Sequence, residues 1–516
     1  MTITYSNIYS DGTRDAAVDS AFDRALDELR HGEPFECLSW IGNERIGSNE
    51  WLDRQDPAHS GVVVSRCSVA GQEVVEKAVL AARVAWPDWR QRSMGDRMAV
   101  LSRAAELFRR DRIKLAARGS LETGKTRADA LAEVDECAAI LELYVRQLTA
   151  EAGYRVSMAP PAADSQAYVE LRPYGVFGVV GPFNFPFAIP LGMAAAALVM
   201  GNTVVLKPSP MTPACGEALA EILFEAGVPQ GALSLLFGCA ETGRALTASP
   251  IDGMAFTGSA EVGLAMHAQL VQPPHSRPLI AEMGGKNPAI VTGRAADLKV
   301  AATAVARSAF GMSGQKCNAC SRVVVTEDVY DDFLAHLVKV VEGLTVGDPG
   351  ERGAFTGPVI NDVALTRFEK IVAAARTEGR IAIGGKSNRE EGFYAELTVV
   401  ADLPYGHWVT REEHFLPVLT VTRVSDFGAA LREANNVEYG LSAGIFTADE
   451  GERAEFLDVV EAGIVFVNNP GGATTGVWPG GQTMSGWKAS GATGKGGFGP
   501  WYLQQYAREQ SRTIYN

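Results

Sequence analysis

The sequence predicts an α/β fold with two domains, each built around a parallel sheet. Short apolar runs alternate with helical stretches between Tyr174 and Val291, which is typical of a parallel sheet covered by helices. A second alternation of the same kind begins at about residue 301. The length of 516 residues is also too great for one ordinary core.

The expected helices and strands follow from the period of the apolar residues. From Gly71 to about Gly153 these residues recur at helical spacing, as in helices with one buried face. Residues 1–60 are polar and lack a clear period, so we interpret them as an N-terminal extension. The runs that we expect to be strands are residues 175–181, 203–206, 233–238, 254–258, 278–283, 321–326, 416–424 and 463–469.

The charge and the cysteines exclude several classes of protein. A net charge of −14 argues against a nucleic-acid partner and against binding to anionic membranes. No apolar run approaches the roughly 18 residues that a membrane span needs, and the N-terminus lacks the order of a signal peptide. The seven cysteines are widely spaced and odd in number, so we expect reduced thiols in a cytoplasmic protein.

Cys317 occupies a position that suits a nucleophile. It lies in a loop between a helical stretch and the strand 323–326, where it can face a cleft. Thiolate is the reactive form, so we expect neighbouring N–H groups or a positive charge to lower its pKa. The alternative is a small buried apolar residue. Cys317 and Cys320 form a C-x-x-C, but without a second pair this pattern predicts no metal site.

Two polar residues that follow apolar runs are candidates for acid–base and oxyanion chemistry. Partial burial of Glu282 at a strand end would raise the pKa of its carboxyl group and suit a general base. Asn184 follows another strand, and its amide can donate to an oxyanion together with a backbone N–H group. Taken alone, the two residues could instead be a solvated acid and a turn residue.

A phosphate site is expected where Gly258 and Ser259 close a strand and open the helix 260–270. A helix N-terminus that directly follows a strand favours a bound phosphate group. The segment 494–499 also matches G-x-G-x-x-G, but no strand precedes it. We therefore do not interpret that segment as a dinucleotide fingerprint.

Several motifs together resemble the aldehyde dehydrogenase superfamily. They occur in the order and with the spacing found in that family, and the resemblance extends over roughly residues 65–516. The motifs are GPFNFP, LKPSP, FTGSAEVG, EMGGKNP, GQKCNACSR, EEHFLP and SGWKASG.

The resemblance implies roles for three catalytic residues. Cys317 resembles the thiol that attacks the aldehyde and forms a thioester. Asn184 and the Cys317 backbone N–H resemble the oxyanion hole, and Glu282 resembles the base that activates water. The implied cofactor is NAD or NADP, which accepts the hydride. The implied cofactor-binding residues are Pro182, Phe183, Lys207, Gly258, Ser259, Glu413 and Phe415.

The resemblance also implies an architecture of two Rossmann-like parallel-sheet domains and a small oligomerisation arm. The segment 510–514 resembles the tail strand that relatives pair across a dimer, so we expect a homodimer or homotetramer. The expected units are an extension (1–60), a dinucleotide-binding domain (61–150 and 168–286), a catalytic domain (287–485) and the arm (151–167 and 486–516).

Three departures from the family's usual motifs bear on specificity. Pro210 stands where many NAD-preferring relatives have a glutamate that binds the ribose 2′-hydroxyl, so we expect NADP+ to be better tolerated. Leu416 replaces a glycine behind the ribose glutamate. Residues 483–488 differ from the usual Pro-Phe-Gly-Gly-x-Lys, which lines the substrate mouth in relatives.

The nucleophile motif most resembles the 1-pyrroline-5-carboxylate (glutamate semialdehyde) dehydrogenase branch, and other motifs are similar to succinylglutamate semialdehyde dehydrogenase. The substrate-binding residues implied by the first branch are Asn318, Gly472 and Ala473, with Asn318 in place of a serine. Glutamate semialdehyde is therefore one candidate substrate, and a hydrophobic or aromatic aldehyde is the other. An apolar mouth for the second could be lined by Phe185, Phe187, Trp478 and Met484.

Other classes of function are compatible with the nucleophile alone. A cysteine-dependent esterase or acyltransferase would use Cys317 without redox chemistry, but the dinucleotide motifs argue against it. A non-catalytic scaffold would have no use for Cys317, Glu282 and Asn184 together. A CoA-acylating dehydrogenase is disfavoured, because such relatives lack the base that Glu282 resembles.

Overall fold

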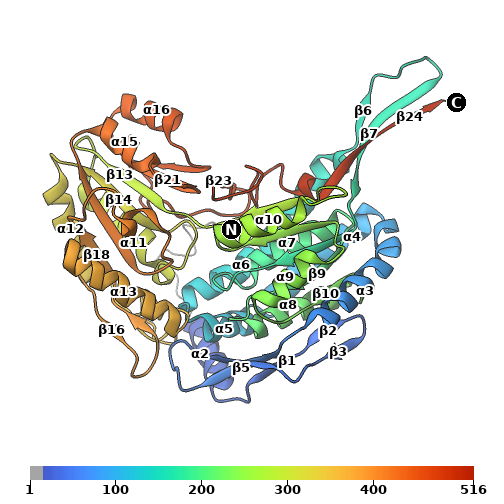
Figure 1. The fold of residues 1–516 in the computed structure, drawn as a ribbon, viewed down its shortest axis with the longest axis horizontal. Coiled ribbons are helices and arrows are strands. Elements are labelled where there is room, and N and C mark those ends of the chain that lie inside the picture. The colour runs from blue at the N-terminus through green and yellow to red at the C-terminus, as the bar shows by residue number, and fades with distance from the viewer. Residues whose placement is uncertain (1–15, 516) are drawn as a thin grey trace.

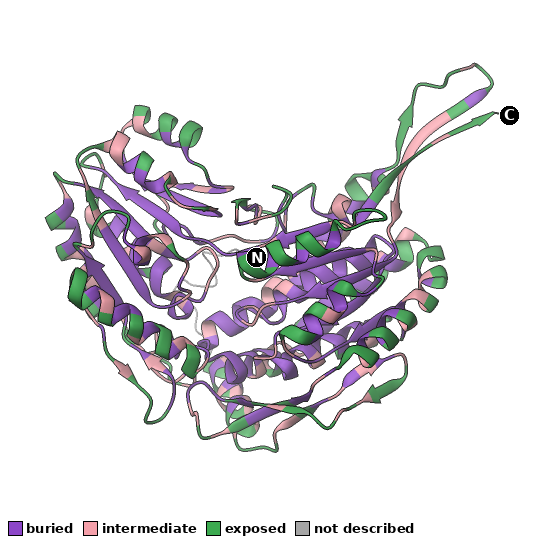
Figure 2. Cartoon of the chain, viewed as in Figure 1, coloured by how far each residue is buried: buried purple, intermediate pink, exposed green. Residues whose placement is uncertain are grey.

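The computed structural model describes residues 16–515, which form two lobes and a projecting arm (Figure 1). Each lobe contains a seven-stranded sheet, and the arm is a three-stranded sheet. Buried residues concentrate in the two large sheets and the helix faces that pack on them, whereas the arm is largely exposed (Figure 2). Within the described residues, no helix is long and apolar enough to cross a membrane. The predicted α/β fold is confirmed.

The first lobe is built on a sheet of mostly parallel strands. In sheet order these are β12 (Leu279–Glu282), β11 (Gly253–Thr257), β8 (Val176–Val180), β9 (Thr203–Lys207), β10 (Leu233–Leu235), β2 (Ser39–Ile41) and β3 (Glu44–Ile46). The first five are parallel, and the antiparallel pair β2–β3 completes one edge. All residues of β8, β9 and β11 are buried, because helices cover both faces.

Two layers of helices cover this sheet. One face carries α3 (Gln72–Gln91), α9 (Ala240–Ala248) and α10 (Ala260–Leu270). The other face carries α4 (Met94–Arg110), α5 (Arg112–Thr123), α6 (Arg127–Ala150), α7 (Ala188–Val199) and α8 (Pro213–Ala226). The second layer forms the largest core of the molecule, and α6 reaches from it towards the other lobe (Figure 1).

Residues 16–60 belong to the first lobe and are not an irregular extension. Helix α2 (Ala16–Arg30) packs on α5 and buries Phe22 and Leu26 in the shared core. The interpretation of residues 1–60 as an extension therefore does not hold for 16–60, while residues 1–15 lie outside the described residues. The strands of this region, besides β2 and β3, are β1 (Phe35–Cys37) and β4 (Trp51–Gln55), which flank β5 (Val63–Ser68).

The second lobe repeats the plan with a different sheet. In sheet order its strands are β15 (Arg380–Ile383), β18 (Thr398–Ala401), β19 (Val418–Val424), β14 (Cys320–Thr326), β13 (Asn287–Val291), β21 (Ser442–Phe446) and β22 (Ile464–Val467). Only β15 runs antiparallel to its neighbour. The covering helices are α11 (Leu298–Phe310) and α12 (Tyr330–Glu342) on one face, with α13 (Asp362–Glu378), α15 (Phe427–Asn435) and α16 (Glu450–Val459) on the other.

The arm joins two distant parts of the chain. Strand β7 (Ser165–Pro173) lies between β6 (Val156–Met158) and the C-terminal strand β24 (Ala507–Tyr515). The β7–β24 pairing extends over nine residues of each strand. The arm projects from the first lobe (Figure 1) and exposes apolar side chains. These are Val156, Met158, Ile514 and Tyr515.

Candidate active site

The candidate residues of the first lobe lie where its parallel strands end. Strand β8 lies between β9 and β11, so the strand order reverses there, and such a switch point is where parallel sheets bind ligands. Glu282 ends β12, Lys207 ends β9, and Asn184 follows β8. Ser259 follows β11 and caps helix α10. The fold therefore brings all four residues to one edge of the sheet.

Cys317 lies in a tight loop that leads into the sheet of the second lobe. The 3-10 helix η2 (Gly311–Gly314) precedes the loop, and β14 follows it. Met312 and Ser313 have positive φ angles of 53° and 55°, a conformation that costs free energy for residues other than glycine. Ser313 secures this turn, because its N–H group donates to Thr356 Oγ1 at 2.6 Å. The nucleophile loop is thus held in a strained and well-defined conformation.

Two side chains hold the main chain that follows the thiol. Asn287 Nδ2 donates to the carbonyls of Cys317 at 2.8 Å and Ala319 at 2.9 Å. Thr474 Oγ1 donates to the carbonyl of Asn318 at 2.7 Å. Three successive carbonyls are therefore fixed, which also fixes the N–H groups between them. We did not predict these two residues from the sequence, although Asn287 lies within the EMGGKNP motif.

The Cys317 thiol is partly buried beside two carboxyl groups. Burial, followed by the charges of Glu282 and Glu413, raises the pKa of the thiol to about 12. The sequence-based expectation of a lowered pKa is therefore wrong for the protein without its cofactor, and a base must take the proton. Cys317 packs against a small apolar cluster of Leu441, Ile464 and Phe466, and Val477 and Met484 pack against the same cluster.

Glu282 has the properties of a general base. Burial raises the pKa of its carboxyl group to about 7, although the N–H group of Gly497 donates to Oε1 at 2.6 Å and acts against this shift. A carboxylate with this pKa can take a proton near neutral pH. The segment 494–499, which resembled a dinucleotide fingerprint, instead contributes this N–H group to the candidate base.

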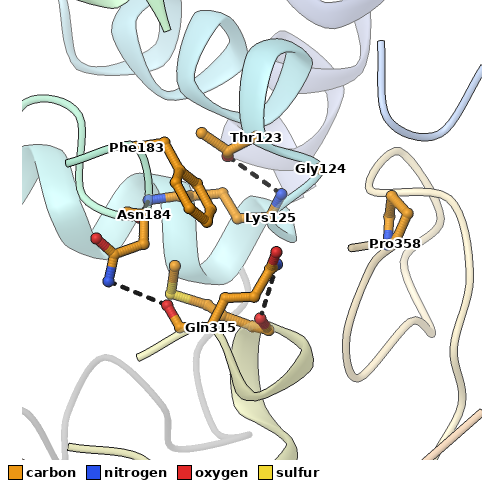
Figure 3. A pocket seen from close by; sticks show the side chains of 8 residues that line it. Thr123, Gly124, Lys125, Phe183, Asn184, Gln315 and Pro358 are labelled. Atoms are coloured by element: carbon orange, nitrogen blue, oxygen red, sulfur yellow. Dashed lines mark hydrogen bonds between the residues drawn. The ribbon is translucent and has the colours of Figure 1, made fainter. Parts of the chain in front are cut away.

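Asn184 points its amide at the nucleophile loop (Figure 3). The residue is 3% exposed, and its Nδ2 donates to the Gln315 carbonyl at 3.0 Å. An amide nitrogen carries two N–H bonds, so this contact orients the group and leaves a second N–H for another acceptor. Gln315 precedes the thiol by two residues, and Pro182 lies in the same loop as Asn184. The amide is therefore oriented by the segment that carries Cys317.

The donors at the ends of β9 and β11 fit a dinucleotide. Lys207 is buried, which lowers the pKa of its amine to about 8, and its Nζ donates to the Gly238 carbonyl at 2.9 Å. Ser259 caps α10, where its Oγ accepts from the Val262 N–H group at 3.4 Å. A helix N-terminus after Gly258 suits a phosphate group, and an ammonium group suits ribose oxygens.

The second lobe contributes Glu413 and Phe415 to the same region. Glu413 Oε1 accepts from the Gly285 N–H group at 2.8 Å, and burial raises the pKa of this carboxyl to about 7. A Cβ at Gly284 would collide with this carboxylate, so the Glu413 side chain could keep its position only beside a glycine. The Phe415 ring meets Phe183 of the first lobe edge-on, with the centroids 5.8 Å apart. The predicted cofactor residues of the two lobes therefore converge.

The predicted substrate-binding loop is only partly open to a ligand. Ala473 is 1% exposed, and its N–H group donates to the Ala304 carbonyl at 3.2 Å. That N–H group is therefore occupied, contrary to the expectation that it binds a substrate carboxylate. A buried N–H group needs a partner, and Ala304 in the middle of α11 supplies it. Asn469 Nδ2 donates to the Gly472 carbonyl at 2.7 Å and closes the loop.

The proposed apolar mouth differs in part from expectation, and Cys320 of the C-x-x-C lies in a core. Phe187 lies in the core of the first lobe, so it does not line a mouth, whereas Met484 packs against the same apolar cluster as Cys317. Cys320 is buried in the core of the second lobe, where its Sγ donates to the Arg322 carbonyl at 3.3 Å. All seven cysteines are free, and residues 16–515 contain no cluster that could hold a metal ion.

Comparison with known proteins identifies similar chains. The sequence profile described as aldehyde dehydrogenase family matches residues 44–511. The 1-pyrroline-5-carboxylate dehydrogenase of Geobacillus sp. (strain WCH70) is 37% identical over 492 residues, which are 94% of each chain.

Two solved structures are also similar. The 1-pyrroline-5-carboxylate dehydrogenase from Thermus with bound NAD has a TM-score of 0.93 at 31% identity, covering 98% of each chain. Proline utilization A from Bdellovibrio bacteriovorus has a TM-score of 0.92 at 33% identity. The match covers 96% of the present chain and 52% of that longer protein.

Proposed function

The chain belongs to the aldehyde dehydrogenase family, and from this we propose that it oxidises glutamate semialdehyde to the carboxylic acid through a thioester on Cys317. It is an NAD(P)-dependent aldehyde dehydrogenase. The observation that best supports the catalytic assignment is that three groups meet at one loop. Glu282 acts on the Cys317 thiol through its charge, and Asn184 binds the carbonyl two residues before that thiol.

Thioester formation begins with transfer of the Cys317 proton. The Glu282 carboxylate takes the proton, and Sγ attacks the aldehyde carbon. The carbonyl oxygen becomes an alkoxide that accepts hydrogen bonds from Asn184 Nδ2 and the Cys317 N–H group. When bound, the nicotinamide dinucleotide supplies the acceptor for the hydride of the former aldehyde carbon. Cys317 then carries the substrate as a thioester.

Hydrolysis of the thioester uses the same base, after Glu282 has released the thiol proton to solvent and is again a carboxylate. Glu282 removes a proton from a water molecule, which attacks the thioester carbonyl. The same two donors stabilise the second tetrahedral alkoxide. The C–S bond breaks, the acid leaves, and the Cys317 thiolate is protonated again. Water therefore supplies the added oxygen, and one aldehyde gives one acid and one reduced cofactor.

The chain's own residues orient the cofactor from both lobes. We assign the pyrophosphate to Gly258 and Ser259 at the start of α10, and an adenosine ribose oxygen to Lys207. Glu413 would bind the ribose on the nicotinamide side. Phe415 and the Pro182–Phe183 segment would flank the ring. The contact between the Phe183 and Phe415 rings supports a position of the ring between the lobes.

Glutamate semialdehyde is supported by the named relatives and by the loop around residue 472. The relatives that are 37% identical are named for 1-pyrroline-5-carboxylate, the cyclic form of that aldehyde. Asn318 is tied to the 469–475 loop through Thr474, so its side chain and Gly472 can serve one carboxylate. A hydrophobic aldehyde is the second candidate, because Cys317 packs against an apolar cluster that contains Phe466 and that Val477 and Met484 also contact.

A panel of aldehydes assayed with NAD+ and with NADP+ tests the proposal. We expect 1-pyrroline-5-carboxylate to give a kcat/KM at least about tenfold above that of aliphatic or aromatic aldehydes, because a site that binds a carboxylate disfavours analogues without one. A higher kcat/KM for an aromatic aldehyde would contradict glutamate semialdehyde as the substrate. Ester hydrolysis without any reduction of the cofactor would contradict the proposed dehydrogenase reaction.

We also propose that the arm forms a homodimer, or a tetramer of dimers, in the cytoplasm. The edge strands β6 and β24 expose apolar side chains on a sheet of only three strands. Such a sheet is stabilised by packing or pairing with another chain. Seven free cysteines support a reducing compartment.

A further inference from the structure

The turn between α5 and α6 contacts both sides of the proposed oxyanion hole. Lys125 lies in this turn, and Asp129 lies directly after it at the start of α6. Lys125 Nζ donates to the main-chain carbonyl of Asn184 at 2.7 Å. Asp129 lies 3.7 Å from the Nζ of Lys316, the residue that precedes the nucleophile. One short segment therefore binds the neighbours of both oxyanion donors.

Lys125 belongs to a buried ion pair with Glu133 of α6. The two side chains are each 1% exposed, with Nζ and Oε2 2.5 Å apart. Glu133 Oε1 accepts from the N–H groups of Phe187 at 2.8 Å and Ala188 at 3.1 Å. Both ends of the segment 184–188 are thereby attached to α6, so the Asn184 side chain starts from a fixed main chain.

A buried ion pair adds little net stability compared with apolar side chains of the same size. Its distinct contribution is a defined geometry, because an ammonium and a carboxylate each need several hydrogen bonds in fixed directions. Here those bonds go to the main chain of the Asn184 loop. The Lys125–Glu133 pair therefore sets the position of the loop more than it adds to the free energy of unfolding.

The other donor is the N–H group of the Lys316–Cys317 peptide. Thr126 Oγ1 donates to Asp129 Oδ2 at 2.8 Å and orients this carboxylate, while Oδ1 faces Lys316. The side chains of Asp129 and Lys316 are both more than nine-tenths buried. The Asp129 carboxylate thus limits the movement of Lys316, whose carbonyl belongs to the same peptide group as the Cys317 N–H.

We propose that the segment 123–133 is a platform that sets the spacing between the two oxyanion donors. Lys125, Glu133 and Asp129 are then positioning residues for Asn184 and for the Cys317 N–H group. This inference rests on the proposed function, since it needs the oxyanion hole to include Asn184. Oxyanion stabilisation depends on donors held about 3 Å from the developing charge, so displacement of the platform lowers kcat.

The test removes the ion pair without leaving a lone buried charge. In the full-length enzyme we combine Lys125→Met with Glu133→Gln. We expect kcat for the aldehyde to fall about tenfold, while NADH binding, measured by fluorescence titration, changes less than about twofold. A matched control, Arg112→Met with Asp135→Asn, removes an ion pair that joins α5 to α6 away from the turn. It should leave kcat unchanged.

A double-mutant cycle identifies the route of the effect. Asn184→Ala alone should lower kcat by about a hundredfold. In the Asn184→Ala background, Lys125→Met with Glu133→Gln should lower kcat less than about twofold, because the amide that the ion pair positions is no longer present. An equal loss in both backgrounds would overturn the platform, as would an unchanged kcat. Full activity of Asn184→Ala would instead overturn the proposed oxyanion hole.

A single conservative change provides a second measurement if the paired variant folds poorly. Asp129→Asn keeps the shape of the side chain and removes the charge that faces Lys316. We expect a several-fold slower formation of reduced cofactor in a single turnover, with the KM for the cofactor unchanged. An unaltered single-turnover rate would overturn the part of the platform that acts on the Cys317 N–H group.

Discussion

At the scale of single residues, the chemistry depends on moving a proton away from Cys317. The thiol lies near Glu282 and Glu413, and burial with these charges raises its pKa to about 12. Near neutral pH the free enzyme therefore carries a thiol. Because burial raises the pKa of Glu282 to about 7, this residue can accept the proton in the pH range where enzymes commonly work.

Replacement of the nucleophile gives the first prediction. Cys317→Ser should lower aldehyde oxidation to below about 1% of the wild-type rate, because a serine hydroxyl is far less readily ionised than a thiol. Cofactor binding should persist, since Lys207 and Ser259 lie in the other lobe. Measurements of NADH formation and NADH fluorescence check the two parts. Substantial remaining activity would place the nucleophile elsewhere.

The base gives a pH-dependent prediction. Glu282 must be ionised to accept a proton, so kcat should rise between about pH 6 and about pH 8, with an apparent pKa of about 7. Glu282→Gln should abolish this rise. Both steps lose their base, but deacylation should slow more than thioester formation, because water holds its proton more tightly than a thiol does and the thiol is also freed of the Glu282 charge that raises its pKa. The variant should therefore show a burst of reduced cofactor followed by slow turnover. A variant that keeps the wild-type profile would show that Glu282 is structural.

The same carboxyl should reduce stability at alkaline pH. Burial raises its pKa from 4.5 to about 7 in the folded protein, so the folded state binds the proton more tightly than the unfolded chain. The free energy of unfolding therefore falls as pH rises through this range and stays lower above it. Glu282→Gln should raise the Tm at about pH 8 and leave it unchanged at about pH 4. The exposed control Glu390→Gln should change neither.

Cofactor choice can be tested at Pro210. This residue follows Lys207 by three positions at the end of β9. Pro210→Glu should shift the kcat/KM ratio several-fold towards NAD+, because a repulsion on the order of 1 kcal/mol would act on a 2′-phosphate. Gln230→Glu, at an exposed site before β10, serves as the control. An unaltered ratio of kcat/KM for NAD+ and NADP+ would count against the assignment of the loop that contains Pro210 to the adenosine ribose.

At the scale of elements, the spacing of apolar residues and the positions of turn residues were sufficient to predict the buried strands. The runs that contain β8, β9 and β11 are apolar throughout, because helices cover both faces of the sheet. Helix α2 was missed although Val18, Phe22, Ala25, Leu26 and Leu29 recur at helical spacing, because the polar residues around this short stripe were given more weight. Its charged residues pair with distant partners, as Arg30 does with Asp56 and Asp348. A local pattern cannot reveal such long-range pairs.

The arm provides a prediction at this scale. Met158→Asp combined with Ile514→Asp places charges on two exposed apolar positions of the three-stranded sheet. If the arm forms the subunit interface, sedimentation should show a shift to monomers, because buried unpaired charges are costly. Val363→Asp changes an even more exposed apolar residue of α13 and should leave the mass unaltered. A variant arm that keeps the wild-type mass would refute the interface.

At the scale of the whole molecule, the site exists because the two lobes meet. Motifs in the sequence identified Asn184, Glu282, Cys317 and Glu413, but only the fold brings Glu413 onto the Gly285 N–H group. The raised thiol pKa and the occupied N–H group of Ala473 could not be predicted, since both depend on neighbours far away in the chain. The supports of the nucleophile loop were missed for the same reason.

The central claim is that Cys317 carries the substrate as a thioester. The most direct measurement uses Glu282→Gln, which should accumulate that intermediate, mixed with NAD+ and 1-pyrroline-5-carboxylate and then quenched in acid. Peptide mass spectrometry should find a glutamyl group on the peptide that contains Cys317, in an amount equal to the burst of reduced cofactor. Adding Cys317→Ser should remove both. A burst without an adduct on Cys317, or with the adduct on another residue, would contradict the account.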